Sequence, residues 1–549
     1  MAQKLTIRVK KSLTKSSVSA AMSRFDHWVA KTPCLDAKPH QRDGVKWCLT
    51  NELKSKPLQG VRGGLVADEM GLGKTYTMIG TIVANRLQRT LIVLPLALLG
   101  QWNRHILKTT DMTSIVFHGA ERSKIPFSEL TSAPIVLTTY DVISGGGTTL
   151  HRINWSRVMF DEAHHLRNSE TSRFYGAHTI KSNIRWLITG TPIQNRLDDF
   201  YALCNMMGLK SKFYTQKCNL KPIARNFLMK RTKQQVGLKL PEKREHKIVV
   251  PWKSAQERQI AEDLHASLAF TGADSKGRKP NNAVARLSQF PLPLMLRARQ
   301  TCVMPGLIQS GVGVIDGDFF DSTDEKEVFS AAMGSSSKID AVIDVLKKRQ
   351  NNKRCKLVFC HFRGEIDALC ERATREGMSV ARFDGRTPKD ERERLLQSKC
   401  DVLVLQIQTG CEGLNLQQFK EVYFVSPTWN PAIEDQAVAR SHRIGQTEPV
   451  DVFRFVMEGF DQMAMTLDSH VERVQTFKRK EADKLDTVKS DEKETKAPTA
   501  SANPVELEQE IVVKKKKTAA AKKKLTKKSL KKIRFVFPKE NTGSASFEP

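Results

Sequence analysis

Short apolar runs alternate with longer amphipathic stretches over residues 37–235, and this alternation predicts strands separated by helices. Each run is three or four residues long and almost wholly apolar, which is typical of a strand buried on both faces. Such strands form a parallel sheet covered by helices on both sides, an α/β fold. The predicted strands of this region are 64–67, 91–94, 135–137, 158–160 and 187–189.

A second series of the same kind predicts a second parallel sheet within residues 335–475. Its predicted strands are 356–359, 380–383, 402–405, 422–425 and 452–455. Residues 236–334 lie between the two series and contain helical stretches at 254–268 and 283–302, with no succession of strands. We therefore expect two α/β lobes, at 37–235 and 335–475, joined by a helical connector.

The two ends of the chain lack this pattern. Residues 1–36 are basic and weakly patterned, so we expect a flexible N-terminal segment. Residues 476–549 are rich in Lys, Glu, Thr, Ala and Ser, a composition that cannot supply a hydrophobic core. We expect them to form a disordered, Lys-rich C-terminal tail.

The charge of the chain indicates a polyanionic partner. The 549 residues have a formal net charge of +30. Thirteen Lys and Arg residues, and no Asp or Glu, lie between Lys514 and Lys539, so the remainder of the chain is strongly basic as well. A basic tail alone would suit a nuclear localisation signal equally well, whereas a basic body in addition favours binding of nucleic acid.

Composition also excludes several classes of protein. No apolar run reaches the roughly 18 residues that a membrane-spanning helix needs, so we expect no membrane partner. The N-terminus lacks the apolar segment of a signal peptide, which favours an intracellular protein. The ten cysteines include no C-x-x-C pair, so we expect no structural zinc.

The strand at 64–67 runs directly into residues 68–75, DEMGLGKT, after which a helical pattern begins. Glycines let backbone N–H groups approach a phosphate, Lys74 adds a positive charge, and the Thr75 hydroxyl can hold Mg²⁺. The usual pattern, G-x-x-x-x-G-K-[ST], has glycine where Asp68 stands. This segment predicts a nucleotide site whose first loop position departs from the common spelling.

A second motif follows the strand at 158–160, where Asp161 and Glu162 begin the sequence DEAH. Asp161 can hold Mg²⁺, usually through water, and Glu162 can orient or deprotonate an attacking water. An acidic pair after a strand is often only a polar turn. In the same lobe as the phosphate loop, however, the pair predicts hydrolysis of ATP.

Two further segments suit the same chemistry. Residues 187–195, LITGTPIQN, contain small hydroxyl residues and a turn, as expected for a loop that senses the state of a phosphate. Arg440 and Arg443 lie three residues apart on one helical face of the second lobe. They could neutralise charge on a γ-phosphate across a cleft, the arginine-finger role. Taken alone, such a pair is usually a solvated face or a contact with DNA phosphates.

Together these segments resemble the motif set of the SWI/SNF-type ATPases, the branch of superfamily 2 that includes chromatin remodellers. The matches occur in the family's order between about 37 and 450 and include DEMGLGKT, LPLALLGQW, LTTYD, DEAHHLRN, ITGTPIQN, FCHF, TGCEGLNL, SPTWNP and SHRIGQ. The chain looks nearest to the subgroup of RING-bearing post-replication repair translocases. Its connector holds only Cys302 and no zinc spacing, so we expect no RING and no ubiquitin ligase activity.

The resemblance implies two RecA-like lobes that use ATP and Mg²⁺ to translocate along double-stranded DNA. It implies catalytic roles for Glu162, Arg440, Arg443 and Gln436. It implies nucleotide contacts for Gln41, which matches the residue that reads adenine, and for Asp68, Glu69, Met70, Gly71, Leu72, Gly73, Lys74 and Thr75, with Thr75 and Asp161 holding the metal. It implies contacts with the DNA backbone, without sequence specificity, for Gln101, Trp102, Thr139, Tyr140, His361, Thr409, Gly410, Asn415 and Trp429.

The expected activity is therefore DNA-stimulated ATP hydrolysis that drives remodelling of protein–DNA complexes in chromatin, transcription or repair. The expected partners are duplex DNA and the nucleosomes or transcription and repair proteins bound to it. The expected location is the nucleus or another intracellular compartment that holds DNA, including a viral factory or virion. The alternative is a strand-separating superfamily 2 helicase that acts on DNA or RNA, against which the spellings DEMGLGKT and SHRIGQ argue.

Overall fold

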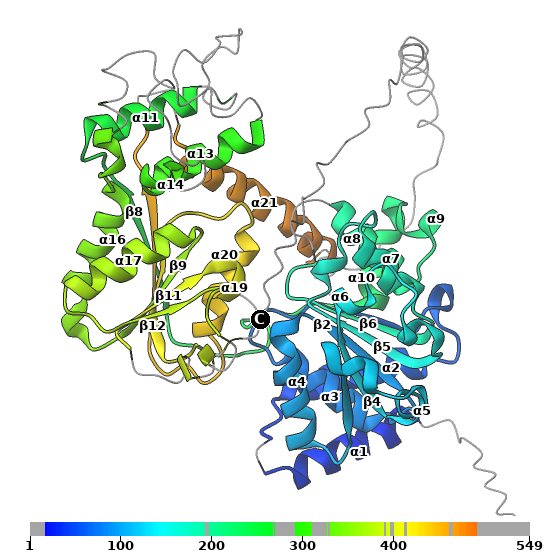
Figure 1. The fold of residues 1–549 in the computed structure, drawn as a ribbon. Helices are drawn as coiled ribbons and strands as arrows, with labels where there is room; N and C mark the ends of the chain where they lie inside the picture. The colour runs from blue at the N-terminus through cyan, green and yellow to red at the C-terminus, as the bar shows by residue number, and fades with distance from the viewer. Residues whose placement is uncertain are drawn as a thin grey trace, which may run out of the picture. The chain divides into compact units, whose positions relative to one another are not determined.

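The computed structural model describes residues 17–33, 35–192, 197–266, 268, 291–309, 327, 330–388, 391, 392, 394, 395, 400–410, 414, 416–460 and 465–490. All of these belong to one compact unit, residues 1–490. Within the described residues the chain forms two parallel β-sheets with helices on both faces of each (Figure 1). The predicted fold class is therefore confirmed. No helix in the described ranges combines the length and the apolar character that crossing a membrane requires.

The first sheet has the described strand order β3-β4-β2-β5-β6-β1-β7, and every pair is parallel. Its strands are β1 (Gly63–Val66), β2 (Thr90–Leu94), β3 (Ser114–Phe117), β4 (Ile135–Thr139), β5 (Trp155–Asp161), β6 (Ser182–Ile188) and β7 (Leu228–Met229). The five predicted strands are all present. The two that were not predicted, β3 and β7, lie at the edges of the sheet, where a short or half-exposed strand carries a weak apolar signal.

Helices cover both faces of this sheet because successive strand residues point to opposite sides. In β1, for example, Leu65 packs into the core on one face and Val66 into the core on the other. The helices on the Val66 face are α1 (Val18–Lys31), α2 (Pro39–Leu53), α3 (Lys74–Ala84) and α4 (Leu96–Thr109). Those on the Leu65 face include α5 (Phe127–Ser132), α6 (Tyr140–Ile143), α7 (Ser172–Thr179), α8 (Leu197–Met207) and α10 (Leu220–Phe227), with the short helix α9 (Ser211–Tyr214) beside them.

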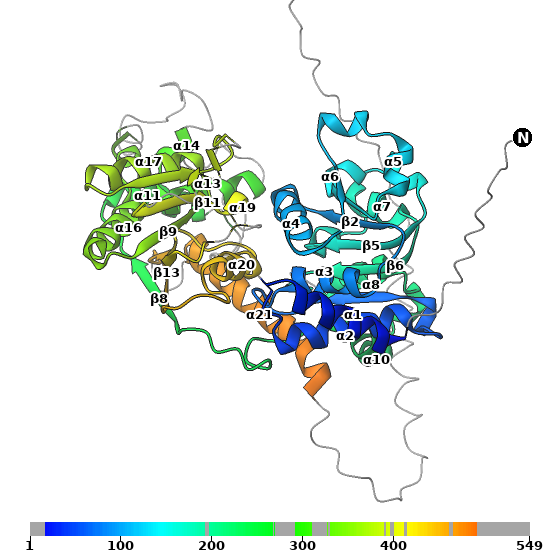
Figure 2. The ribbon, with the colours of Figure 1, turned by 90° about the horizontal axis from the view of Figure 1, so that it is seen from below.

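The N-terminal segment differs from the prediction of a flexible 1–36, because Val18–Lys31 forms helix α1. Figure 2 shows α1 beside α2 and α3, where its buried side chains include Phe25 and Trp28. The indole N–H of Trp28 donates to the Thr109 carbonyl at 2.5 Å. The apolar residues of this helix recur at helical spacing but are too few to stand out in a basic sequence. Residues 1–16 lie outside the described residues.

The second sheet has the described strand order β10-β11-β9-β12-β13-β8, again all parallel. Its strands are β8 (Lys243–Val250), β9 (Cys355–Cys360), β10 (Val380–Phe383), β11 (Val402–Gln406), β12 (Phe419–Phe424) and β13 (Val450–Met457). One face is covered by α11 (Ala255–Ala266), α13 (Pro291–Val303), α14 (Gly306–Gln309), α16 (Ser337–Lys348), α17 (Arg363–Arg375) and α21 (Leu467–Ser490). The other face is covered by α19 (Ile407–Gly410) and α20 (Pro431–Ser441).

Two predicted segments need correction at this level. The predicted helical connector, 236–334, contains strand β8, which pairs with β13 at the edge of the second sheet. Because β8 begins with charged, exposed residues, its sequence did not resemble a buried strand. The predicted disordered tail, 476–549, begins too early, since helix α21 continues to Ser490. Residues 491–549 lie outside the described residues, and the domain boundaries themselves stay predictions.

A buried ion pair joins the helices of the first lobe to its sheet. Glu52 of α2 and Arg157 of β5 are both fully buried, and the Glu52 carboxylate accepts from Arg157 Nε at 2.6 Å and Nη2 at 2.5 Å. It also accepts from Trp186 Nε1 at 2.8 Å and Asn85 Nδ2 at 2.7 Å. One carboxylate therefore ties together α2, the end of α3, β5 and β6.

We predict that Glu52→Ala destabilises the protein by about 3–5 kcal/mol, because it leaves the Arg157 charge buried without its counter-charge. Denaturant unfolding of the wild type and the variant measures this difference. The control is Glu121→Ala, which removes an exposed partner of Lys124 and is expected to change stability by less than about 1 kcal/mol. Equal stability of the Glu52 and Glu121 variants would contradict the prediction.

Candidate functional site

The loop at 68–75 leaves the carboxyl end of β1 and turns into helix α3 at Lys74. Gly71 has φ 89° and Gly73 has φ 81°, backbone conformations that favour glycine. At Gly73 a side chain is also excluded by contact, since an added Cβ would lie 2.2 Å from Gln41 Nε2. Both glycines are therefore needed for the loop to turn with its backbone exposed toward a phosphate.

The side chains of Lys74 and Gln41 both donate hydrogen bonds to main-chain carbonyls of the phosphate loop. The Lys74 ammonium donates to the Asp68 carbonyl at 2.8 Å, and the Gln41 amide donates to the Leu72 carbonyl at 3.2 Å. Burial lowers the pKa of Lys74, while the charges of Glu162, Asp68 and Asp161 oppose this change. The predicted nucleotide residues are thus brought together around one loop.

Arg231 explains why Asp68 stands where the common pattern has glycine. The Arg231 guanidinium donates to both carboxylate oxygens of Asp68, at 3.0 and 2.5 Å, and to the His40 carbonyl at 2.6 Å. Asp68 is buried, so this bidentate pair compensates its charge. Sequence reasoning missed Arg231 as a site residue, although its segment FLMKRTK stands out as a basic run directly after an apolar one.

The acidic pair lies at the carboxyl end of β5, next to the loop. Asp161 Oδ2 accepts from Trp102 Nε1 at 2.7 Å, and Asp161 Oδ1 accepts from the Glu162 backbone N–H at 3.0 Å. Glu162 has φ 49° and ψ 49°, a left-handed backbone conformation that is strained for a residue with a side chain. Its Oε2 lies 3.2 Å from His164 Nδ1, which is 3.4 Å from the hydroxyl of Thr189.

The environment shifts the pKa values of the two carboxylates in opposite directions. Burial and the neighbouring Glu162 charge raise the pKa of Asp161. Burial also acts to raise the pKa of Glu162, but the hydrogen bond and charge of His164, with the charges of Arg440 and Lys74, outweigh it and lower that pKa. Glu162 therefore stays an anion to lower pH than Asp161, as suits a water-orienting base.

The arginine pair of the second lobe lies at the same loop. An added Cβ on Gly71 would come within 3.4 Å of Arg443 Cβ, and Lys233 Nζ donates to the His442 carbonyl at 3.4 Å while pairing with Glu69. Arg440 lies in the last turn of α20, close enough that its charge lowers the pKa of Lys74. Gln436, on the same helix, is buried.

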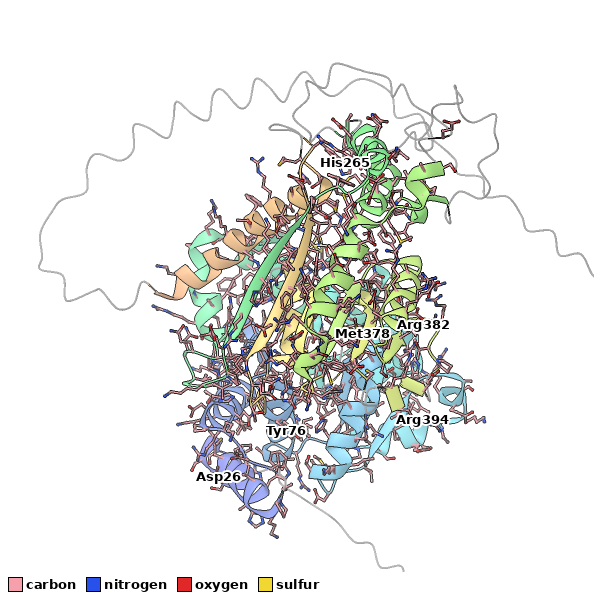
Figure 3. All side chains as sticks on the ribbon, turned by 90° about the vertical axis from the view of Figure 1, so that its left-hand side faces the viewer. Asp26, Tyr76, His265, Met378, Arg382 and Arg394 are labelled. Carbon is pink, nitrogen blue, oxygen red and sulfur yellow. The ribbon has the colours of Figure 1, made fainter. Side chains whose placement is uncertain are left out.

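Helices α3 and α4 meet beside the loop through an aromatic contact. Tyr76, labelled in Figure 3, packs edge-on against the His105 ring with the ring centroids 5.2 Å apart. Burial, followed by the charges of Arg104 and Arg443, lowers the pKa of His105. This contact links the phosphate-loop helix directly to α4, the helix that carries Trp102.

The predicted DNA contacts divide into three groups. Burial contradicts side-chain contacts at Trp102, Thr139 and Tyr140, which are 1%, 1% and 3% exposed. Contacts at three half-buried residues, Gln101, His361 and Trp429, stay predictions. Thr409 and Gly410 lie in α19 but their side chains are outside the described set, and so is all of Asn415.

Two of the buried residues, Tyr140 and Thr139, and the half-buried His361 have partners within the protein. The Tyr140 hydroxyl donates to the Asp161 carbonyl at 2.7 Å, and the Thr139 hydroxyl lies 3.2 Å from His118 Nδ1. His361 Nε2 lies 2.7 Å from Arg299 Nη2, and burial together with the Arg299 charge lowers the pKa of His361. The DNA-contact segments themselves stay predictions, and the resemblance could not tell which side chains of a segment point inward.

The arrangement fits a nucleoside triphosphate with Mg²⁺. The loop supplies backbone donors at two left-handed glycines, and the Lys74 ammonium lies inside it. Thr75, in the first turn of α3, and Asp161 are the residues that could hold the metal. The ITGTP segment also closes on the loop, since an added Cβ on Gly190 would lie 2.8 Å from Met70 Cγ and 3.4 Å from Lys74 Nζ. Residues 193–195, the end of the segment LITGTPIQN, are outside the described ranges.

Comparison with known proteins gives two family matches. The SNF2-related domain matches residues 40–307, and the helicase conserved C-terminal domain matches residues 337–445. A solved structure of the Sulfolobus solfataricus SWI2/SNF2 ATPase core in complex with dsDNA is 26% identical, with 81% of this chain and 92% of that chain covered and a TM-score of 0.36.

Three curated relatives illustrate the range of similar proteins. A probable global transactivator of Orgyia pseudotsugata multicapsid polyhedrosis virus is 27% identical, with 82% of this chain and 93% of the viral protein covered. The ATP-dependent DNA helicase DDM1 of Arabidopsis thaliana is 28% identical over 76% of this chain, and the chromatin-remodelling ATPase ISW1 of Saccharomyces cerevisiae is 29% identical over 77%. The chain spans 58% and 38% of the lengths of these two relatives.

The two family models follow each other in the order of the two lobes, and together they match most of the chain. The first match contains Lys74 and Glu162 and the second contains Arg443, the residues that the structure brings to one loop. The nearer resemblance to the RING-bearing subgroup stays a prediction. The chain belongs to the SWI/SNF family of ATPases, as its motifs predicted.

Proposed function

We propose that this protein is a DNA-stimulated ATPase that translocates on double-stranded DNA and so remodels protein–DNA complexes. The observation that carries the proposal is the meeting of three parts at one loop: the glycine turn with Lys74, the Asp161–Glu162 pair, and the Arg443 segment of the second lobe. A phosphate site completed by a second lobe changes when the lobes move, which is the requirement for a motor.

Each residue has a distinct part in this proposal. ATP and Mg²⁺, when bound, supply the scissile phosphate and neutralise part of its charge. Glu162, held as an anion, orients a water and can accept its proton. Lys74 offers its ammonium to the phosphates, and Arg443 and Arg440 add positive charge from the second lobe. The adenine contact of Gln41 rests on the family resemblance.

The proposed polymer is duplex DNA bound through its phosphates. The chain is strongly basic, which favours a polyanionic partner, and its relatives include the chromatin-remodelling ATPase ISW1. Phosphate contacts give affinity without sequence specificity, as a translocating enzyme requires. The proteins to be displaced or moved on the DNA would be nucleosomes or transcription and repair factors, in whichever DNA-containing compartment the protein occupies.

The decisive experiment compares ATP hydrolysis with no polymer, duplex DNA, single-stranded DNA, RNA and nucleosomes. We expect duplex DNA to stimulate hydrolysis more than single strands or RNA, with stimulation falling as salt rises because Lys and Arg contacts release counterions. Equal stimulation by all the polymers would contradict translocation on duplexes. Displacement of a strand from a blunt duplex would favour the helicase alternative.

We predict that Lys74→Ala and Glu162→Gln each reduce duplex-stimulated hydrolysis by on the order of 100-fold or more, because one removes a phosphate donor and the other a base. Glu162→Gln should retain binding of ATP, which a fluorescent nucleotide measures. The control is Lys31→Ala at the end of α1, with expected hydrolysis like the wild type. Full activity of Glu162→Gln would remove Glu162 from the chemistry.

We predict that Arg443→Ala reduces the maximal rate by on the order of 1000-fold, the range found for arginine fingers, while nucleotide affinity changes much less. The matched control is Arg375→Ala, which removes an exposed arginine of the second lobe that pairs with Glu371. A rate change shared by both variants would indicate a general effect on the lobe instead of a contact with the transition state.

A further inference from the structure

Trp102 is buried beside the carboxylate of Asp161, the residue proposed to hold the metal. Its side chain is 1% exposed, and its indole N–H donates to Asp161 Oδ2 at 2.7 Å. The residue lies in the second turn of α4, which begins directly after β2, the strand next to β5. Helix α4, which follows β2, thus holds the Asp161 side chain at the end of β5, the neighbouring strand.

Asp161 is held at three points. The Trp102 indole binds one carboxylate oxygen and the Glu162 backbone N–H binds the other. The Tyr140 hydroxyl donates to the Asp161 main-chain carbonyl at 2.7 Å. Two of these three donors, Trp102 and Tyr140, come from LPLALLGQW and LTTYD, segments that the resemblance predicts to contact the DNA backbone.

The solvent side of α4 suits a polyanion. The helix, LALLGQWNRHILKT, contains no acidic residue, and Arg104 and Lys108 are exposed on it. Its inner side holds Leu98, Trp102 and Ile106 in the core. A duplex on the outer side would therefore act on a helix whose inner side is hydrogen-bonded to Asp161.

We propose that Trp102 is a positioning residue that couples α4 to the Asp161 carboxylate, so that binding of duplex DNA along α4 adjusts how Asp161 holds Mg²⁺. This inference rests on the proposed function, because it needs a DNA-stimulated ATPase. The indole is rigid and hydrogen-bonded to a buried charge, so a small movement of α4 changes the direction and strength of that bond. Hydrogen bonds of this kind to a metal ligand typically contribute 10- to 100-fold to metal affinity or activity.

The test is Trp102→Phe, which keeps an aromatic ring in the core and removes only the donor side of the indole. Its matched control is Trp155→Phe, because Trp155 is also 1% exposed, lies in the same lobe, and donates to a backbone carbonyl, that of Leu150 at 3.0 Å. Hydrolysis is measured against Mg²⁺ concentration at saturating ATP, with and without duplex DNA, and Tm is measured for each variant.

We expect Trp102→Phe to raise the Mg²⁺ concentration for half-maximal hydrolysis by about 10-fold and to lower the ratio of duplex-stimulated to basal rates. Trp155→Phe should lower Tm to a similar degree while leaving both quantities at their wild-type values. Mg²⁺ curves and stimulation ratios that coincide for the two variants would overturn the inference, although duplex-stimulated hydrolysis by the wild type would keep the proposed function. A wild type without duplex stimulation would instead refute the proposed function.

Tyr140→Phe provides a second route if Trp102→Phe does not fold. It removes the hydroxyl that donates to the Asp161 carbonyl, and its expected effect on Mg²⁺ dependence has the same direction and a smaller size. Its control is Tyr423→Phe, which removes a buried hydroxyl bond to Glu421 in the second lobe. An unchanged Mg²⁺ requirement in Tyr140→Phe would also count against coupling through Asp161.

Discussion

The direction of the strands in the first sheet is the constraint on which the site depends. Every described strand of that sheet runs parallel to its neighbours, so the chain leaves each strand at the same edge. The phosphate loop leaves β1 there, α4 leaves β2, and Asp161 ends β5. Residues of the phosphate loop and Asp161, which are far apart in sequence, therefore lie at one edge of the sheet.

The loop itself is held from outside by a charge that the common phosphate-loop pattern lacks. Asp68 is the loop's first residue, and Arg231 reaches it from the segment that follows β7. The same segment continues to Lys233, which contacts Glu69 and the backbone next to Arg443. The chain segment that leads from the first lobe to the second is thus bonded to the beginning of the nucleotide site. A movement of the second lobe can therefore act on the loop through Arg231 and Lys233.

Sequence patterns predicted most of this architecture because buried parallel strands have a strong apolar signal. They failed where the signal is weak: β8 begins with charged residues at a sheet edge, and α1 has few apolar positions in a basic stretch. Lys74 and Glu162 could be singled out from the sequence because they belong to compact motifs, and their roles stay predictions. The inward orientation of Trp102 and the partner of Asp68 depend on tertiary contacts, which residue types in a segment do not specify.

Helix α1 has a consequence for what counts as the ATPase core. The Phe25 ring lies so close to α3 that an added Cβ on Gly80 would be 2.7 Å from it, and Arg24 Nε donates to the Ala84 carbonyl at 2.7 Å. The outer wall of the phosphate-loop helix is therefore built by residues that precede the first family motif. The smallest fragment that folds as a complete nucleotide-binding lobe should begin ahead of Ser17, because a cut at α2 would open an apolar groove along α3.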